Sequence, residues 1–232
     1  MYTFDTNKAV DELTKNGFTY LPSIFELTQS LNTYSSICSQ LNGKTYIENS
    51  LGQNELVNAM GLEKLFDKFL KSNEENYGAK LGKDDKYFIA RHVKPGQNSE
   101  AYRGHFDSHL LTIVLPIKIP EIVNGKNTER GELKAFPKTR SFRKSEILNI
   151  FQKLYWKLFA SKSGFEKLEK NNKMICEYFD DYRPFAFIGV TTFHGNNIVS
   201  SENTDRLTLL CHCFDPSPKF GIGNTLRKLR NR

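Results

Sequence analysis

The segment His105-Phe106-Asp107 places an imidazole and a carboxylate two residues apart, in a stretch that we expect to be a strand. Side chains two residues apart in a strand point to the same face, so both groups would project from one rigid element. A second predicted strand ends in His194. If the two strands are neighbours, two histidines and one carboxylate form the facial ligand set that binds non-haem Fe(II) and leaves coordination positions open. The sequence therefore predicts a metal centre at His105, Asp107 and His194.

Arg206 adds a second chemical feature beyond this set. It lies 12 residues after His194, and the residues between them are rich in turn formers, so the chain can return as the next antiparallel strand. A guanidinium keeps its charge and can hold a carboxylate through two parallel hydrogen bonds. A small dicarboxylate held by Arg206 at one end could chelate the metal at its other end.

Three polar residues on the predicted strands are candidates for further contacts with such a co-substrate. Tyr87 and Arg91 share one face of the strand that precedes the His-Phe-Asp segment. Thr192 lies two residues before His194 and shares its face. The alternative for each of them is ordinary strand packing.

Two more histidines and a tryptophan are candidates for a substrate pocket. His109 continues the face of the His-Phe-Asp pair, and His212 continues the face of Arg206. Trp156 lies in an aromatic segment that interrupts the strands. Each of the three could instead be a packed core residue, and for His92 we expect only a structural role.

The elements that must position these residues change character along the chain. Residues 6–16, 27–41 and 54–72 carry apolar side chains at helical spacing, and Gly61 is expected to divide the last segment. From Tyr87 onward short β-rich segments dominate, without the strand–helix alternation or the glycine-rich loop of a dinucleotide-binding fold. The predicted fold class is mostly β with flanking helices, as an antiparallel sandwich or jelly roll.

The chain of 232 residues is expected to form one domain. Residues 1–84 would be a helical support, 85–215 the β core with a helical insertion at about 140–182, and 216–232 a basic tail. The insertion contains an amphipathic helix over 145–159, which we expect to cover the mouth of the site near His194 as a lid. The alternative is packing on an outer sheet face, with Ile150, Leu154 and Leu158 as core residues.

The composition is that of an ordinary globular protein and not of a disordered or collagen-like chain. Hydrophobic residues make up 38% and charged residues 25% of the chain, as in ordinary globular proteins. No apolar run approaches the roughly 20 residues of a membrane-spanning helix, and the polar N-terminus is unlike a secretory signal. We therefore expect a cytoplasmic protein without a membrane partner.

The net charge of +7 permits nucleic-acid binding but does not indicate it. The four cysteines lack zinc-site spacing and are expected to be reduced thiols.

The order His-Phe-Asp, then GELKAFP (131–137), then a histidine followed by an arginine, resembles the 2-oxoglutarate/Fe(II)-dependent oxygenases. The segments KNGFTYLPSIF (15–25), GELKAFPKTR (131–140) and HGNNIVSSENTDR (194–206) are similar to segments of the phytanoyl-CoA dioxygenase-like branch. The chain departs from that branch at 138–140, where Lys-Thr-Arg replaces Gly-Ser-His. The Gly-Glu-Leu strand also resembles prolyl-hydroxylase-like members, and we favour the first branch.

This resemblance implies a double-stranded β-helix, a cupin-like jelly roll. It implies an enzyme with Fe(II), 2-oxoglutarate and O2 as cofactor and co-substrates, which releases succinate and CO2 while it hydroxylates a small organic molecule. Iron would be bound by His105, Asp107 and His194, and the distal carboxylate of 2-oxoglutarate by Arg206. The related halogenases lack the carboxylate ligand, so Asp107 favours hydroxylation.

Three alternatives remain at this point. A hydroxylase of peptidyl side chains would carry the same ligands. A nucleic-acid demethylase would suit the positive charge of the chain. Members of that branch are marked by two arginines six residues apart after the distal histidine, and this chain has Arg206 followed by His212 at that spacing, so we do not expect a nucleic-acid partner. A cupin-like module that binds a ligand without turnover is the alternative outside the enzymes.

Overall fold

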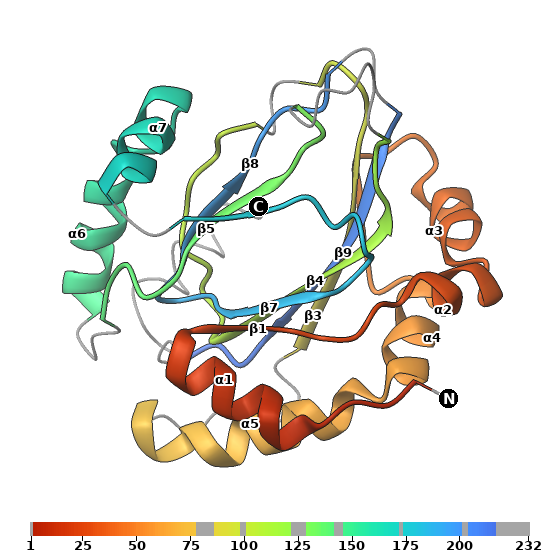
Figure 1. Cartoon of the computed structure of the whole chain (residues 1–232), viewed down its shortest axis with the longest axis horizontal. Helices are drawn as coiled ribbons and strands as arrows, with labels where there is room; N and C mark the ends of the chain where they lie inside the picture. Colours follow the sequence, from red (N-terminus) through yellow and green to blue (C-terminus); the bar gives the residue numbers. More distant parts are fainter. Residues whose placement is uncertain are drawn as a thin grey trace.

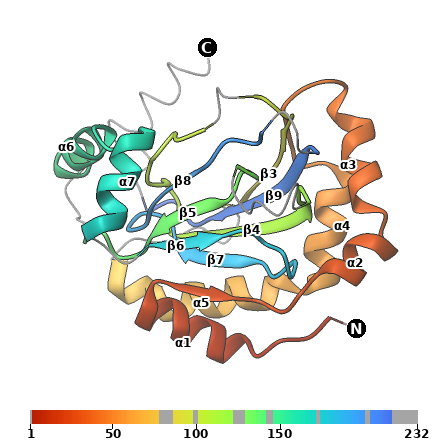
Figure 2. The ribbon, with the colours of Figure 1, turned by 45° about the horizontal axis from the view of Figure 1, so that its top comes forward.

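The fold consists of two antiparallel β-sheets that face each other, with helices on both outer sides (Figures 1 and 2). The computed structural model describes residues 2–77, 86–97, 101–121, 129–141, 146–171, 174–200 and 204–216. The predicted fold class, mostly β with flanking helices in a jelly roll, is confirmed. The predicted basic tail falls almost wholly on 217–232, outside the described residues.

The elements follow one another as helices, then strands, with a helical pair inserted between strands. The helices are α1 (Thr6–Asn16), α2 (Phe25–Ser30), α3 (Thr33–Leu41), α4 (Leu51–Met60), α5 (Leu62–Tyr77), α6 (Glu146–Lys157) and α7 (Lys162–Asn171). The strands are β1 (Phe18–Tyr20), β2 (Tyr46–Glu48), β3 (Lys86–Val93), β4 (Leu111–Lys118), β5 (Leu133–Phe136), β6 (Ile175–Glu177), β7 (Phe185–Ile188), β8 (Phe193–Asn196) and β9 (Arg206–Cys213).

Local signals explain where the N-terminal helices begin and end. The carboxylate of Asp5 accepts hydrogen bonds from the first backbone amides of α1, and Gly17 ends the helix in the left-handed conformation (φ 85°). Gly61 (φ 64°) separates α4 from α5 in the same way, as predicted. The single helix predicted over 27–41 is in fact two helices, because Asn32 adopts a left-handed conformation between α2 and α3.

The larger sheet has the strand order β1-β7-β4-β9-β3-β2, and the smaller one has the order β6-β5-β8. The long strand β9 pairs with β3 on one side and with β4 on the other. The second predicted strand, which ends in His194, is in fact two strands, because the chain turns after Ile188 and passes from β7 in the larger sheet to β8 in the smaller one. This crossing places His194 in the smaller sheet.

Three apolar clusters fill the layers. The largest lies between the larger sheet and helices α1, α3, α4 and α5, and it includes the buried Cys211 and Cys213. The second lies between the two sheets. The third lies outside the smaller sheet and joins Phe136 and Phe193 to Phe165 of α7, a helix that our sequence analysis did not predict. All four cysteines are free thiols, as expected.

Helix α6 forms within the predicted segment, and Trp156 packs against Phe106 and Phe193, whereas two of the core residues of the alternative packing are exposed. Leu154 and Leu158 are exposed, so they are not core residues of an outer sheet face. The helix lies at the edge of the molecule beside α7 (Figure 1). No described helix is long and apolar enough to cross a membrane.

Candidate metal centre

The His-Phe-Asp segment lies just before β4, not within a strand as predicted, because β4 begins only at Leu111. His105 nevertheless forms an isolated antiparallel bridge with His194, in which each backbone amide donates to the other residue's carbonyl (2.9 and 3.0 Å). This bridge aligns the segment with the start of β8. The predicted proximity of the two elements is therefore observed, with a short bridge in place of a full strand pair.

The side chains of His105, Asp107 and His194 converge on one point. Each offers one ligand atom, and these atoms lie within 4.8 Å of one another. The Nε2 atom of His105 is 3.3 Å from Oδ1 of Asp107, and Nε2 of His194 is 3.6 Å from Oδ2. A metal ion with ligands at about 2.0–2.2 Å spaces its neighbouring ligand atoms by about 3 Å. The three groups are thus close to the arrangement that one ion requires.

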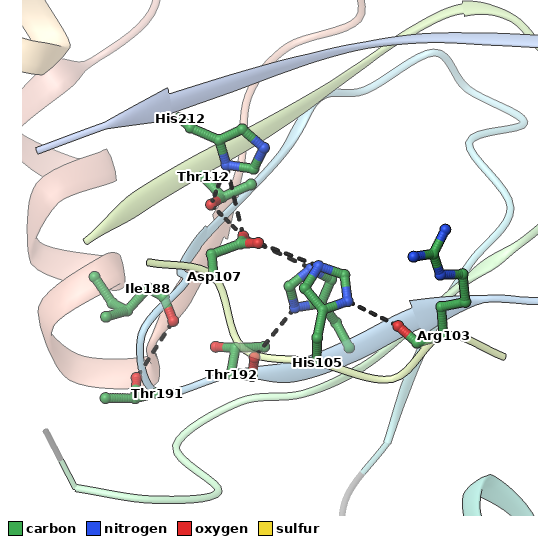
Figure 3. A network of polar contacts seen from close by, with 9 residues as sticks. Arg103, His105, Asp107, Thr112, Ile188, Thr191, Thr192 and His212 are labelled. Carbon is green, nitrogen blue, oxygen red and sulfur yellow. Dashed lines mark hydrogen bonds and ion pairs between the residues drawn. The ribbon is translucent and has the colours of Figure 1, made fainter. Parts of the chain in front are cut away.

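Backbone carbonyls fix the orientation of both imidazoles. Nδ1 of His105 donates to the carbonyl of Arg103 (2.7 Å, Figure 3), and Nδ1 of His194 donates to the carbonyl of Thr192 (3.1 Å). Because a carbonyl can only accept, each Nδ1 carries the proton. Each Nε2 is then left with its lone pair toward Asp107, which is the tautomer that binds a metal.

The charge of the site also suits a cation. Burial acts to raise the pKa of Asp107, but the neighbouring His194, His212 and His105 outweigh it and hold this pKa well below its usual range. Burial lowers the pKa of His194 to about 4 and also lowers the pKa of His212. Burial acts to lower the pKa of His105, but its hydrogen bond to Asp107 and the charge of Asp107 outweigh burial and raise this pKa. The site thus holds a buried carboxylate beside two imidazoles of lowered pKa and one of raised pKa, and these groups bind a divalent ion in their deprotonated state.

Thr112 is a site residue that the sequence analysis missed. Its hydroxyl donates to Oδ2 of Asp107 (2.6 Å) and lies 3.1 Å from Nδ1 of His212 (Figure 3). This contact orients the carboxylate from the face of the larger sheet that points toward the smaller one. The available signal was a single polar residue within the apolar run 110–117, on the face that points between the sheets.

Close approach at Gly189 brings β7 against this carboxylate. The Gly189 carbonyl accepts a hydrogen bond from the Asp107 amide (3.2 Å). A Cβ atom added at this glycine would lie 2.8 Å from the Cβ of Asp107 and 2.8 Å from Oγ1 of Thr112. Only glycine fits here without displacing the site.

Arg206 is the first residue of β9 and pairs in register with Val93 of β3. It is 2% exposed, and its guanidinium lies 5.8 Å from the ring centroid of Phe179. No side-chain hydrogen bond or ion pair joins it to any other described residue. Burial, together with the charge of Arg91, lowers its pKa to about 9, although Glu132 opposes this shift. A buried guanidinium fits the predicted role of binding an anionic group.

Tyr87, His109 and His212 form a group of nearly parallel rings beside Asp107. The His109 and His212 ring centroids are 5.4 Å apart, and that of Tyr87 lies 6.5 and 6.3 Å from them. The Tyr87 hydroxyl donates to the carboxylate of Glu48 on β2. The structure thus brings together three of the residues predicted for the site's surroundings.

The remaining predicted site residues lie in different surroundings. Arg91 is on the same face of β3 as Tyr87, opposite Thr208 of β9. Thr192 is fully buried, and its hydroxyl has no hydrogen-bond partner. Burial, followed by the charge of Arg103, lowers the pKa of Arg91. An unpartnered buried hydroxyl and a cluster of cationic side chains both suit a polar, anionic ligand.

Trp156 lies behind the metal residues. Its ring packs against Phe106 and Phe193, with centroids 5.8 and 5.2 Å away. Phe193 points away from the space between the sheets, because it alternates with His194 along β8. We therefore do not assign Trp156 to the pocket.

His92 lies on the outer face of the larger sheet, where Nε2 is 2.7 Å from Oδ2 of Asp205. The same carboxylate contacts Nζ of Lys118 (2.5 Å) and accepts from the hydroxyl of Tyr34 (2.7 Å). This cluster joins α3, β3, β4 and the residue before β9, and it agrees with the structural role expected for His92.

Comparisons with known proteins were made for both sequence and structure. No protein-family model matches the sequence, and no curated protein matches it significantly. Among solved structures, a prolyl-4-hydroxylase from Pseudomonas putida aligns with a TM-score of 0.55 at 14% identity, over 92% of this chain and 96% of that chain. The chain has the fold of this prolyl-4-hydroxylase.

Two further structures support this fold assignment. The non-haem α-ketoglutarate-dependent carbocyclase SnoK from nogalamycin biosynthesis aligns with a TM-score of 0.53 at 12% identity, over 95% of this chain and 89% of that one. A prolyl hydroxylase from Trichoplax adhaerens, in complex with a peptide fragment, aligns with a TM-score of 0.50 at 11% identity over 90% and 89%. These neighbours do not support our preference for the phytanoyl-CoA dioxygenase-like branch over the prolyl-hydroxylase-like one.

Proposed function

We propose that this protein is a non-haem Fe(II)- and 2-oxoglutarate-dependent dioxygenase that hydroxylates a small organic molecule. The observation that carries the proposal is the convergence of His105, Asp107 and His194, with ligand atoms within 4.8 Å of one another, in a chain with the fold of such oxygenases. Two imidazoles and one carboxylate leave up to three coordination positions open for co-substrate and dioxygen.

Residues of the chain would orient the three metal ligands. The Thr112 hydroxyl holds the Asp107 carboxylate, and the Arg103 and Thr192 carbonyls hold the two imidazoles with Nε2 toward the ion. The Phe187 ring on β7 of the larger sheet, whose centroid is 4.8 Å from that of His194, would shield this imidazole from water. When bound, iron supplies activation of dioxygen coupled to decarboxylation of 2-oxoglutarate to succinate and CO2.

Arg206 would bind the distal carboxylate of 2-oxoglutarate. Its burial removes water that would compete for the anion, so the ion pair would be strong. Tyr87, Arg91 and Thr192 are proposed as further co-substrate contacts, and His109 and His212 as residues of the substrate pocket. A dianionic co-substrate is compatible with the clustered guanidinium groups of Arg91 and Arg206.

The test is iron-dependent conversion of 2-oxoglutarate to succinate, measured by mass spectrometry with and without Fe(II). We expect succinate from the wild-type protein and none above background from His194→Ala. The matched control is His92→Gln, which alters a histidine on the outer face of the larger sheet and should retain conversion. A wild-type protein that binds neither iron nor 2-oxoglutarate would indicate the non-catalytic cupin-like module instead.

A peptidyl side chain is the second candidate substrate. The prolyl hydroxylases among the structural neighbours favour it, one of them in complex with a peptide fragment. Parallel assays with a metabolite mixture and with proline-containing peptides distinguish the two. A mass increase of 16 Da on a peptide, coupled to succinate formation, would assign the protein to peptidyl hydroxylation.

A further inference from the structure

Helix α6 presents its apolar side chains to solvent. Four of them and Leu158, in the turn directly after the helix, are between 52% and 75% exposed, and we call these five residues the α6 seam. The α6 seam consists of Ile147, Phe151, Leu154, Tyr155 and Leu158. By contrast, α1 directs Ala9, Val10 and Leu13 into the core. In a surface helix the apolar face normally points toward the core. In α6 an apolar face points toward solvent instead.

The spacing of the seam is that of a helix–helix contact. Ile147, Phe151 and Leu154 follow one another at intervals of four and three residues, so they form one strip along the helix, and Leu158 follows in the turn after it. On the other side of the helix, Oε1 of Gln152 is buried without a hydrogen-bond partner. The helix therefore holds a polar group on its inner side and an uninterrupted apolar strip on its outer side.

The area of the seam matches one half of a protein interface. Enclosed aromatic side chains bury about 150–250 Å², so two aromatic and three aliphatic side chains that are more than half exposed present on the order of 600 Å². This is at the upper end for the largest apolar patch of a monomer, and two such seams would bury about 1,200 Å² in total, which is the lower limit for a standard interface and fits a dimer that dissociates on dilution. Among the described residues, α6 is attached through Trp156 and through the carbonyl of Asn149, which accepts from Arg140 (3.5 Å), and neither of these residues belongs to the seam.

We propose that the α6 seam packs against the same seam of a second copy of this chain, as an antiparallel helix pair around a two-fold axis. The seam contains no charged residue, so two identical seams do not repel each other, and an isologous contact requires only that the surface complement itself. In an antiparallel pair the axis passes near the middle of the strip, between Phe151 and Leu154. This proposal is independent of the proposed enzymatic function.

The experiment is sedimentation velocity of the full chain over a range of concentrations. We expect a dimer that dissociates on dilution. Leu154→Glu should raise the dissociation constant on the order of 100-fold or more, because each dimer would bury two carboxylates in an apolar contact. Leu51→Glu is the matched control, since Leu51 is 70% exposed on α4, away from the seam, and the variant should still dimerise. Leu154 is exposed in the protomer, so the variant should keep its fold and succinate formation.

A second measurement locates the axis. Leu154→Cys should form an intermolecular disulfide under mild oxidation, faster than the wild-type chain with its four native cysteines. A wild-type chain that is monomeric at all concentrations overturns the proposal. So does a dimer that Leu154→Glu leaves intact, or a monomer that cosediments with vesicles of phosphatidylcholine and phosphatidylserine through the seam.

Discussion

Asp107 and Asp205 are both carboxylates contacted by several side chains from separate elements, but their partners differ in kind. Asp205 is paired with the ammonium group of Lys118 and also contacts His92 and Tyr34, so its charge is balanced within the chain. Asp107 contacts the Thr112 hydroxyl and imidazoles, and burial lowers the pKa of two of these imidazoles, His194 and His212. The comparison shows two settings for a carboxylate: Asp205 is paired with an ammonium group of the chain, whereas Asp107 faces imidazoles that can bind a cation together with it.

Asp107→Asn is expected to have the largest effect, because it removes the only charge of the ligand set. Iron binding should fall to background, and succinate formation with it. Metal content after anaerobic loading and desalting measures this directly. The comparison variant Asp205→Asn should retain one iron per chain, and equal iron content in the two variants would contradict the distinction drawn here.

Arg206→Ala should weaken 2-oxoglutarate binding while iron binding changes little. Loss of a desolvated bidentate ion pair costs about 2–5 kcal/mol, or roughly 30-fold to several thousand-fold in affinity. Calorimetric titration of the Mn(II)-loaded protein with 2-oxoglutarate measures it. The affinity of Arg206→Lys for 2-oxoglutarate should lie between those of the wild type and Arg206→Ala, because lysine keeps the charge without the planar guanidinium. An unchanged affinity would move the role to Arg91.

Metal binding should stabilise the folded chain by mass action. At a free metal concentration 100 times the dissociation constant the gain is about 2.7 kcal/mol, or on the order of 5–10 °C in Tm for a chain of this size. Thermal unfolding with and without Mn(II) measures the gain. Asp107→Asn should lose it and Asp205→Asn should keep it, so a Tm rise that survives Asp107→Asn would place the ion elsewhere.

Asp205→Asn should destabilise the metal-free protein by about 1–3 kcal/mol, because Lys118 would lose its partner in a partly exposed cluster. Urea unfolding of the metal-free protein measures the change. Lys118→Gln is the reciprocal variant and should have an effect of similar size. A loss of metal binding in either one would show that the cluster is not independent of the site.

The same cluster predicts a dependence on acid. Burial acts to raise the pKa of Asp205, but hydrogen bonds from Lys118, Tyr34 and His92 outweigh it and lower this pKa to about 2. A carboxylate with a depressed pKa contributes stability that is present above its unfolded value near 4 and is lost as the pH falls toward 2. The difference between wild type and Asp205→Asn should therefore shrink over that range.

The sequence was sufficient for features that depend on local pattern. The His-Phe-Asp pair and His194 could be found from their residue types and spacing, although the strand expected at 105–107 does not form and an isolated bridge aligns the pair with His194 instead. The role of Arg206 stays a prediction. The strand break at Gly189 could not be found, because the glycine is required by a contact with Asp107 and Thr112, which are distant in sequence.

Other features depend on tertiary packing in the same way. The role of Thr112 depends on His212, which lies 100 residues further along the chain. Helix α7 was missed because Phe165 and Leu168 are its only large buried apolar residues among charged neighbours. The apolar periodicity of α6 predicted a helix correctly, but periodicity does not specify which surface an apolar face will meet.

The turn at Gly189 has a mechanical consequence. It is the point at which the chain leaves one sheet and enters the other, and the ligand set lies against it, with His194 on the smaller sheet and Asp107 tethered to Thr112 on the larger one. An ion held there would act as a cross-link between the two halves of the molecule. Loss of iron would then free the sheets to separate locally, raise amide exchange in β8, and shorten the lifetime of the protein in the presence of proteases.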